Sequence, residues 1–550
     1  MMSTDLSLPV TAKTILQTHF PEIPEFRDVQ VAAIATILKG QNCLCLMATG
    51  AGKSLVYQVA GIASKKVTIV MSPLIALMGQ QVQILKERGL TAVSLSEFTT
   101  IKAYEELRRF PFRNGPAFLF ITPERAAFDG FLEYVLTKEK ENIGLIVVDE
   151  SHCVSQWGYT FRPAYAGIPR FLDRVFGREG WPAVLCLTAT LNPNDRREIQ
   201  IMFRINMEDI AESQALLRTN LALQTEVFDD EKMKKERLQD LLSEHQGQKI
   251  IVYVHRKKSK KFGTRAMAEE FAAEGIVCRH FDADMAPDER MKVLDEFQRG
   301  EIKVIFATGA FGMGIDIPDI RVIIHYLIPE SIEQYYQEVG RAGRDGEPAF
   351  GYLLYTPTNA KVRIDMIKRS APKREDIQDT FTRKFGAKNM PIRTIHPWAD
   401  LSEENAELVI WHYLEEKEVV KVVAKGPGSL NQFEPHVNQQ CPEFAIYTGI
   451  SKAGLILKIH HELKVPVSRI VSDIYTAYHD KRLKAIRVPE KLIFYTSPKE
   501  LSNNVLEEME AEIKQRIDAR LDGFEALKNF IESRRPADEV IREHLGITRS

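Results

Sequence analysis

The segment that decides the fold is "NCLCLMATGAGKSLVYQVAGIA", residues 42–63, because it joins a strand pattern to a helix pattern through a glycine-containing loop. Its apolar start is typical of a buried strand, and its apolar end has the spacing of a helix. Residues 47–54 match the phosphate-loop pattern except that Met47 replaces the first glycine. Gly50 and Gly52 would let backbone N–H groups face phosphate oxygens at the positive end of the helix dipole. The segment predicts a nucleotide-binding α/β sheet; a plain glycine turn is the alternative.

Short apolar runs separated by helical patterns recur along the chain up to residue 357. They are "NCLCLMA", "KVTIVMS", "AFLFIT", "GLIVVDE", "AVLCLTAT", "KIIVYVH", "IKVIFAT", "RVIIHYL" and "GYLLYT". Continuous Val, Ile and Leu runs of this kind are typical of parallel strands buried on both faces. Because the pattern pauses near residues 205–235, it predicts two parallel-sheet domains in tandem, residues 1–210 and 211–357.

The rest of the chain has a different character. Residues 358–390 hold nine Lys or Arg against four Asp or Glu, which fits a basic connector along a polyanion or a solvated helix face. Residues 391–550 read as a mainly helical accessory region. The stretch 402–429 predicts a helix, a strand and a Gly-Pro-Gly turn that could be part of a winged helix. Apolar residues recur at helical spacing from Leu506 to Ile531, which predicts one long helix.

Composition narrows the class of protein. The 550 residues are 44% hydrophobic and 27% charged, which is ordinary for a globular protein, and the net charge of −2 confines any nucleic-acid contact to local patches. No apolar run is long enough for a membrane span, and the first residues lack a signal-peptide pattern. The six cysteines have no C-x-x-C spacing. We therefore expect reduced thiols, no zinc, no membrane contact and a cytoplasmic or nucleoid-associated protein.

Four residues of the first domain have the chemistry of nucleotide hydrolysis. Lys53 would reach the β- and γ-phosphates, and the Ser54 hydroxyl would coordinate Mg²⁺. Asp149 and Glu150 end an apolar run about 100 residues later. Asp149 would hold Mg²⁺ through water, and Glu150 would orient and deprotonate the attacking water. A solvated acidic turn is the alternative for this pair.

Two arginines in "YYQEVGRAGRDG", residues 335–346, could neutralise charge on the transferred phosphate from the opposite side. Arg341 and Arg344 are three residues apart, so we expect them one helical turn apart on the same face. They belong to the second domain, and a site divided between two domains closes on nucleotide and opens after hydrolysis. Structural arginines paired with nearby acids are the alternative.

These motifs, in this order, resemble those of the RecQ family of superfamily 2 helicases. The resemblance covers residues 20–357 and includes "FRDVQ", "MATGAGKS", "SPLIALMGQQV", "TPER", "DESHCVSQWG", "LTATLNP", "AFGMGIDIP" and "QEVGRAGRDG". It implies two RecA-like domains and an ATP-dependent helicase that moves 3′ to 5′ on single-stranded and forked DNA, with ATP and Mg²⁺ as cofactors.

The resemblance also implies roles for further residues. Those expected at the nucleotide are Arg27, Gln30, Thr49, Gly50, Ala51, Gly52, Gly314, Asp316 and Gln337. Those expected on the DNA path are Ser72, Pro73, Thr122, Pro123 and Arg256, with Thr188 and Thr190 linking it to the ATP state. The loop after the acidic pair places Trp157 and Phe161 for base stacking and adds the cation of Arg162; packing beneath the loop is the alternative.

The chain departs from the family pattern at several points. Tyr159 and Thr160 replace the usual His and Asp of the aromatic loop, and Asp282 and Asp284 stand where the family has His-Ala-Gly, a change with no evident reason. Of the four zinc-binding cysteines common after the second motor domain, only Cys441 could correspond. A duplex translocase without strand separation, a binding scaffold with a lapsed motor, and an RNA substrate remain open, as does a protein partner for the accessory region.

Overall fold

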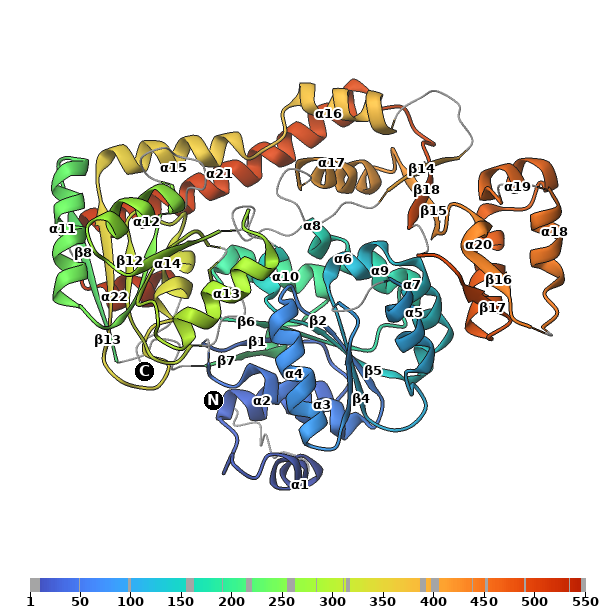
Figure 1. Ribbon diagram of the computed structural model, residues 1–550, viewed down its shortest axis with the longest axis horizontal. Coiled ribbons are helices and arrows are strands. Elements are labelled where there is room, and N and C mark those ends of the chain that lie inside the picture. Colours follow the sequence, from blue (N-terminus) through green and yellow to red (C-terminus); the bar gives the residue numbers. More distant parts are fainter. Residues whose placement is uncertain are drawn as a thin grey trace.

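The computed structural model describes residues 10–48, 50–96, 100–154, 163–189, 191–213, 220–254, 263–282, 284–309, 311–312, 317–385, 392–396, 405–437, 439–450, 454–488, 491–533 and 535–545. Two parallel sheets form two lobes that lie beside each other, and a C-terminal region lies across both of them (Figure 1). We call these parts the first lobe, the second lobe and the C-terminal region, which begins at residue 370.

The first lobe is a seven-stranded sheet with the order β3-β4-β2-β5-β6-β1-β7, and all its pairs are parallel. Its strands are β1 (Cys43–Leu46), β2 (Val67–Met71), β3 (Thr91–Ser94), β4 (Ala117–Ile121), β5 (Ile143–Val148), β6 (Ala183–Thr188) and β7 (Ile210–Glu212). Its helices are α1 (Val10–His19), α2 (Asp28–Leu38), α3 (Lys53–Ser64), α4 (Ile75–Glu87), α5 (Thr100–Arg109), α6 (Pro123–Phe128), α7 (Gly130–Lys138), α8 (Pro163–Ala166), α9 (Ile168–Phe176) and α10 (Pro193–Phe203). Helices cover both faces, so the central strands are buried throughout.

The second lobe is a six-stranded parallel sheet with the order β10-β11-β9-β12-β13-β8. Its strands are β8 (Leu221–Val227), β9 (Lys249–Tyr253), β10 (Cys278–Phe281), β11 (Val304–Ala307), β12 (Ile320–His325) and β13 (Ala349–Tyr355). Its helices are α11 (Glu231–Glu244), α12 (Thr264–Ala273), α13 (Pro287–Gln298), α14 (Ile332–Val339) and α15 (Pro357–Arg369). The prediction of two tandem RecA-like parallel sheets is confirmed.

The C-terminal region is mainly helical. Its elements are α16 (Arg374–Thr380), β14 (Arg393–Ile395), α17 (Asn405–Glu416), β15 (Lys421–Gly426), β16 (Phe433–Pro435), α18 (Pro442–Ile450), α19 (Ile456–Leu463), α20 (Val467–His479), β17 (Leu483–Ala485), β18 (Leu492–Thr496), α21 (Asn503–Ser533) and α22 (Ala537–His544). The strands form the antiparallel sheets β14-β18-β15 and β16-β17. Helix α17 and strand β15 confirm the helix and strand expected in 402–429, and α21 confirms the long helix. The winged helix stays a prediction.

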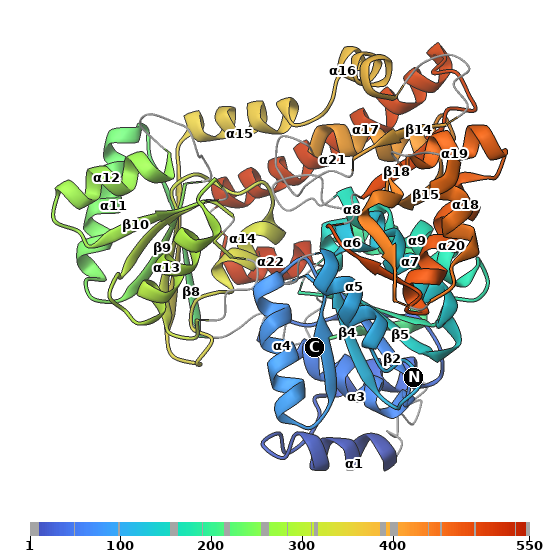
Figure 2. The same ribbon diagram turned by 45° about the vertical axis from the view of Figure 1, so that its right-hand side comes forward.

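The C-terminal region packs on both lobes. Next to the first lobe, Tyr475 of α20 contacts Phe131 of α7, with ring centroids 5.3 Å apart. At the other end, Phe530 of α21 lies 6.1 Å from Tyr335 of the second lobe, and α21 runs toward that lobe in both ribbon views (Figures 1 and 2). Residues of α21 and α22 belong to the apolar core of the second lobe. The C-terminal region is thus joined to both lobes.

The basic segment 358–390 presents less charge than its composition indicates. Arg363 of α15 is fully buried, and its Nε donates to the Ile328 carbonyl oxygen at 2.9 Å. Arg374 pairs with Glu510 of α21 at 2.8 Å, and Lys384 pairs with Glu407 of α17. Several of its cations therefore fasten α15 to the second lobe and the elements that follow α15 to the C-terminal region.

Two further sequence observations have structural counterparts. Asp282, which had no evident reason to be acidic, is buried and accepts hydrogen bonds from Thr264 Oγ1 at 2.6 Å and from the Asp284 backbone N–H at 3.0 Å, so it fixes the turn after β10. All six cysteines are buried free thiols. Within the described ranges there is no helix that is both long and apolar enough to cross a membrane, and no group of three or more His, Cys, Asp or Glu that could hold a metal ion.

Candidate nucleotide site between the two lobes

The phosphate loop has the expected strand, turn and helix. The backbone N–H of Met47 donates to the Thr188 carbonyl oxygen at 3.1 Å, so the loop leaves the sheet beside β6. Gly50 and Gly52 have φ angles of 77° and 86°, which are left-handed values that favour glycine, and α3 begins at Lys53. The loop is therefore shaped by its two glycines at the amino end of a helix, where backbone N–H groups are available to an anion.

Gln30 of α2 forms a hydrogen bond with this loop. Its Nε2 donates to the Gly52 carbonyl oxygen at 3.1 Å, and its Oε1 accepts from the Arg27 backbone N–H at 2.9 Å. A Cβ atom on Gly52 would come within 2.9 Å of Gln30 Nε2, which is a second reason for glycine there. The side chain of Gln30, expected at the adenine, is therefore bound to protein at both ends of its amide in this structure.

Asp149 and Glu150 follow β5 at the same edge of the sheet. Ser72 at the end of β2 donates its hydroxyl to Asp149 Oδ2 at 3.2 Å, and the Tyr165 hydroxyl donates to the Asp149 carbonyl oxygen at 2.7 Å. Glu150 has a φ of 50°, an uncommon value for a side chain other than glycine, and its Oε1 lies 3.8 Å from Lys53 Nζ. This backbone conformation directs the carboxylate toward the phosphate loop.

The two neighbouring carboxyl groups are electrostatically different. Burial, together with the charge of Glu150, raises the pKa of Asp149 to about 6. Burial alone would also raise the pKa of Glu150, but the Lys53 ammonium and His152 lower it below its usual range, with a smaller effect from Arg341. Glu150 is therefore ionised at neutral pH, whereas at Asp149 burial and the charge of Glu150 outweigh the lowering effect of Lys53 on the pKa.

His152 contributes to the site although its sequence position did not single it out. It lies in a short 3₁₀ turn after the acids and is buried. Its Nδ1 is 3.2 Å from Glu150 Oε2 and 3.0 Å from Thr188 Oγ1. It therefore joins the acidic pair to the end of β6. The signal available in the sequence was its place two residues after Glu150.

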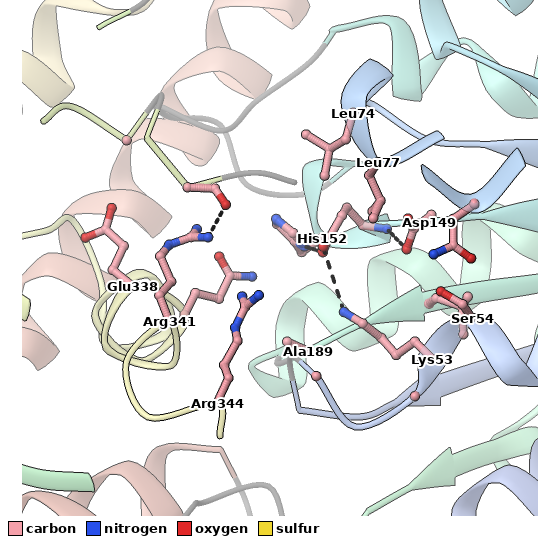
Figure 3. Close-up of a pocket in the computed structure, with 18 of the residues that line it drawn as sticks. Lys53, Ser54, Leu74, Leu77, Asp149, His152, Ala189, Glu338, Arg341 and Arg344 are labelled. Carbon is pink, nitrogen blue, oxygen red and sulfur yellow. Dashed lines mark hydrogen bonds and ion pairs between the residues drawn. The ribbon is translucent and has the colours of Figure 1, made fainter. Parts of the chain in front are cut away.

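The second lobe completes a cavity of about 280 Å³ that faces the phosphate loop. Figure 3 shows Lys53, Asp149 and His152 on one side of it and Arg341 and Arg344 on the other. The lining residues from the first lobe are Gly50, Gly52, Lys53, Ser54, Tyr57, Leu74, Leu77, Gln81, Asp149, Glu150, His152, Leu187 and Ala189. Those from the second lobe are Gly309, Gly312, Gln334, Gln337, Glu338, Arg341 and Arg344. The cavity thus brings together the phosphate loop, the acidic pair and Gln337 with both arginines, whereas Arg27, Gln30 and Ala51, which were also predicted at the nucleotide, are not among its lining residues.

The prediction that the two arginines share a helix face is wrong in its local geometry. Helix α14 ends at Val339, and Arg341 and Arg344 lie in the turn that follows. Gly340 is the C-cap residue of the helix, and Gly343, between the two arginines, has a φ of 62°, a left-handed value that does not continue a helix. Arg341 donates to the Gly312 carbonyl oxygen, which orients its guanidinium at the cavity wall.

The residues expected on the DNA path are only partly described. Ser72 and Pro73 follow β2, and Thr122 and Pro123 follow the neighbouring strand β4, so they share one edge of the sheet. Thr122 also caps α6, because its Oγ1 accepts from the Arg125 N–H at 3.2 Å. The predictions for Thr49, Trp157, Phe161, Arg162, Thr190, Arg256, Gly314 and Asp316 lie outside the described residues.

The cavity has the chemistry that a magnesium–nucleoside triphosphate requires. Lys53 Nζ is buried and makes no hydrogen bond within the described part of the chain, so a cation is available at the phosphate loop. Ser54 and Asp149 supply the oxygen atoms that Mg²⁺ prefers. Two arginines face them from the second lobe. The residues that line the cavity therefore fit a magnesium–nucleoside triphosphate.

Two family models match the chain. The DEAD/DEAH box helicase model matches residues 27–199, and the helicase conserved C-terminal domain model matches residues 233–346. These ranges contain the phosphate loop, the acidic pair and both arginines.

Curated relatives are similar over 64–73% of the chain. A probable ATP-dependent DNA helicase RecS of Bacillus subtilis is 29% identical over 73% of this chain and 79% of its own length. The ATP-dependent DNA helicases RecQ of Bacillus subtilis and Haemophilus influenzae are each 32% identical, over 66% and 64% of this chain. The chain spans 59% and 54% of the length of these two RecQ proteins.

Solved structures share the fold. Yeast Dbp5 bound to RNA and ADP BeF3 (the L327V variant) matches with a TM-score of 0.50 and 17% identity, covering 66% of this chain and 92% of that chain. The DUF1998 helicase MrfA bound to DNA matches with a TM-score of 0.52 and 16% identity, covering 76% of this chain and 62% of that chain. At these identities the likeness concerns the arrangement of the two lobes.

Proposed function

Because the chain belongs to the RecQ-like family of ATP-dependent DNA helicases, we propose that it hydrolyses ATP to move 3′ to 5′ along single-stranded DNA and to separate duplex at a fork. The observation that carries the proposal is the single cavity lined by the phosphate loop of one lobe and by two arginines of the other. We assign residues 1–210 to the ATP-binding domain, 211–357 to the second helicase domain, 358–390 to a connector and 391–550 to the accessory region.

In the first lobe, we assign each residue a role from its position in the cavity. The backbone at Gly50 and Gly52 binds phosphate oxygens, and Lys53 neutralises their charge. Ser54 and Asp149 hold Mg²⁺, which when bound neutralises phosphate charge and polarises the bond that breaks. Glu150 accepts a proton from the attacking water, and its contact with His152 fixes its carboxylate.

In the second lobe, Arg341 and Arg344 stabilise negative charge that develops on the transferred phosphate, and Gln337 orients groups beside them. These side chains help only when the lobes approach, so hydrolysis and lobe movement are coupled. The hydrogen bond from Ser72 to Asp149 supports a second coupling, because Ser72 lies on the sheet edge proposed to contact the DNA backbone.

The test uses two substitutions in the first lobe. Lys53→Ala and Glu150→Gln are compared with the parent chain for ATP turnover with single-stranded DNA and for opening of a fork with a 3′ tail. We expect both variants to lose both activities, and we expect the parent to open a 3′-tailed substrate but not a 5′-tailed one. Fork opening by either variant would refute the role of the site, and ATP turnover in the parent without any strand separation would favour a duplex translocase.

Location and partners extend the proposal. A DNA substrate fits a cytoplasmic or nucleoid-associated protein. Both ends of the C-terminal region are occupied by contacts with the lobes, so a protein partner would use its outer surface.

A further inference from the structure

Glu333 lies at a junction of three parts of the molecule. It is in the first turn of α14 and is only 2% exposed. Its Oε1 accepts from Asn192 Nδ2 of the first lobe at 2.9 Å and lies 2.8 Å from His544 Nε2 of α22. One carboxylate oxygen therefore binds the first lobe and helix α22 from within the second lobe.

The first-lobe partner is itself held firmly. Asn192 caps α10, because its Oδ1 accepts from the Asp195 N–H at 2.9 Å, and its Nδ2 also donates to Asp195 Oδ2 at 2.9 Å. It follows β6 by four residues, and β6 ends at Thr188 beside His152. The contact of Glu333 with Asn192 therefore connects α14 to a part of the first lobe that lies close to Asp149 and Glu150.

Helix α14 carries the second-lobe side of the same site. Gln334, Gln337 and Glu338 line the cavity, and Arg341 lies two residues after the helix end. Glu338 is buried and bonded to His325 at 2.7 Å, so α14 is fixed within its own lobe. The contact of its first turn with the first lobe therefore influences how far Arg341 stands from the phosphate loop.

The C-terminal helices hold the other side of this junction. Arg520 of α21 pairs with Glu330 at 2.7 Å, three residues before Glu333. Arg516, one turn earlier, approaches Glu198 of α10 with an N–O distance of 3.7 Å. Ile541 of α22 is buried in the second-lobe core, so His544 is presented from a fixed helix. Both C-terminal helices thus lie against the boundary between the lobes.

The charges at the junction favour an ion pair. Burial would raise the pKa of Glu333, but the contacts with His544 and Ser331 lower it to about 2. Burial would lower the pKa of His544, but Glu333 raises it above its usual value, with a smaller effect from Asp195. The carboxylate is therefore ionised at neutral pH and needs its two donors, since removing a donor from a buried charge is costly.

We infer that Glu333 is a positioning residue for ATP hydrolysis: Asn192 and His544 hold its carboxylate so that α14 presents Arg341 to the phosphate loop. The C-terminal helices thereby become part of the motor. The inference rests on the proposed function, since it concerns the rate of that reaction. It predicts that the junction affects turnover more than nucleotide affinity, because the first-lobe phosphate site is left intact.

The test compares four substitutions in the full chain. Asn192→Ser keeps a capping oxygen for α10 but removes the donor to Glu333. Glu333→Met removes the acceptor at similar volume, and Glu333→Gln keeps an acceptor without charge. Glu543→Gln, which removes an exposed charge on the same helix α22, is the control. ATP turnover with single-stranded DNA, ATP KM and the melting temperature are measured for each.

We expect Glu333→Met to lower kcat about tenfold, Asn192→Ser about fivefold, and Glu333→Gln less than Glu333→Met. ATP KM should stay within about twofold, and Glu543→Gln should match the parent. Asn192→Ser should have no further effect in the Glu333→Met background, because both remove the same contact.

Turnover by Asn192→Ser and Glu333→Met within about twofold of the parent would overturn the inference, as would additive effects in the double variant. A fall in kcat that follows a fall in melting temperature in every variant would show a structural role only and would also overturn it. Absence of ATP turnover in the parent chain would instead refute the proposed function.

Discussion

The cleft between the lobes and the surface that joins the C-terminal region to the first lobe differ in chemistry. The cleft encloses about 280 Å³ of space and has charged and polar groups on both sides, together with Leu74, Leu77 and Leu187 on the first-lobe side. The other surface is closed by an aromatic cluster of Phe131, Tyr134, Tyr475 and Tyr478. It also contains a buried ion pair between Lys425 and Glu133 at 2.8 Å. The comparison indicates that the lobes meet across an open cavity, whereas α20 and β15 of the C-terminal region are fixed to the first lobe by close packing.

The largest effect is expected from the cleft. Arg344→Ala should lower kcat for ATP by about 10³-fold or more, because an arginine opposite the phosphate loop supplies charge that one lysine and Mg²⁺ do not. Arg341→Ala should also lower kcat and, through loss of the Gly312 contact, reduce the stability of the second lobe. Steady-state turnover with saturating single-stranded DNA measures both. Nearly normal turnover by both variants would contradict a role of the second lobe in ATP hydrolysis.

The next largest effect is expected on stability, at the surface that joins the C-terminal region to the first lobe. A Cβ atom on Gly130 would overlap the Lys425 carbonyl oxygen, so Gly130→Ala should lower the free energy of unfolding by about 1–3 kcal/mol. Gly523→Ala in α21 is the matched control, since its Cβ would make only an ordinary contact with Ser331 at 3.9 Å. It should stabilise the protein by about 0.5–1 kcal/mol. Urea unfolding measures both changes, and equal effects would contradict the close approach at Gly130.

A smaller effect is expected on acidification. Burial would raise the pKa values of Asp129 and Glu133, but Lys491 and Arg125 lower that of Asp129, and Lys425 and Arg174 lower that of Glu133. Because both values lie below those of the unfolded chain, their contribution is present above about pH 4.5 and is lost as the pH falls through the folded values. Asp129→Asn should flatten the fall in melting temperature between pH 5 and 3. An unchanged pH profile would show that the carboxylate of Asp129 does not contribute to the stability lost on acidification.

The smallest effect is expected at the exposed ion pair of Arg383 with Asp379, at 2.7 Å. Both side chains are about 70% exposed, so the pair is screened by water, and Arg383→Ala should change the free energy of unfolding by less than about 0.5 kcal/mol. Urea unfolding measures this change. A larger loss would mean that the basic segment has a structural role beyond Arg363 and Lys384.

The central strands of both sheets could be predicted from the sequence because they are apolar throughout. The strands β3, β7, β8 and β10 were missed, and all four are sheet edges. An edge strand is partly exposed, as β3 and β8 show, and therefore lacks the continuous apolar run that marks a buried strand.

The site was predictable where residues are close in sequence, as in the phosphate loop and the acidic pair. The sequence also predicted that Arg341 and Arg344 act opposite Lys53, but the arrangement of the two lobes that brings them together is contained in no local pattern. The end of α21 shows the same limit. Its apolar spacing predicted a helix, but only the structure shows that Phe524 and Phe530 complete the second-lobe core. For this reason a truncation at residue 390 would expose that core, and point substitutions are the cleaner experiment.

The central claim is that the two lobes close on one nucleotide, and an inter-lobe distance tests it most directly. Cysteines introduced at the exposed residues Lys13 and Glu236 carry spin labels, while the six native thiols are buried. With a non-hydrolysable ATP analogue and single-stranded DNA, the distance should change in the parent and stay at its nucleotide-free value in the Arg341→Ala/Arg344→Ala variant. A distance that is the same with and without nucleotide in the parent would contradict the claim.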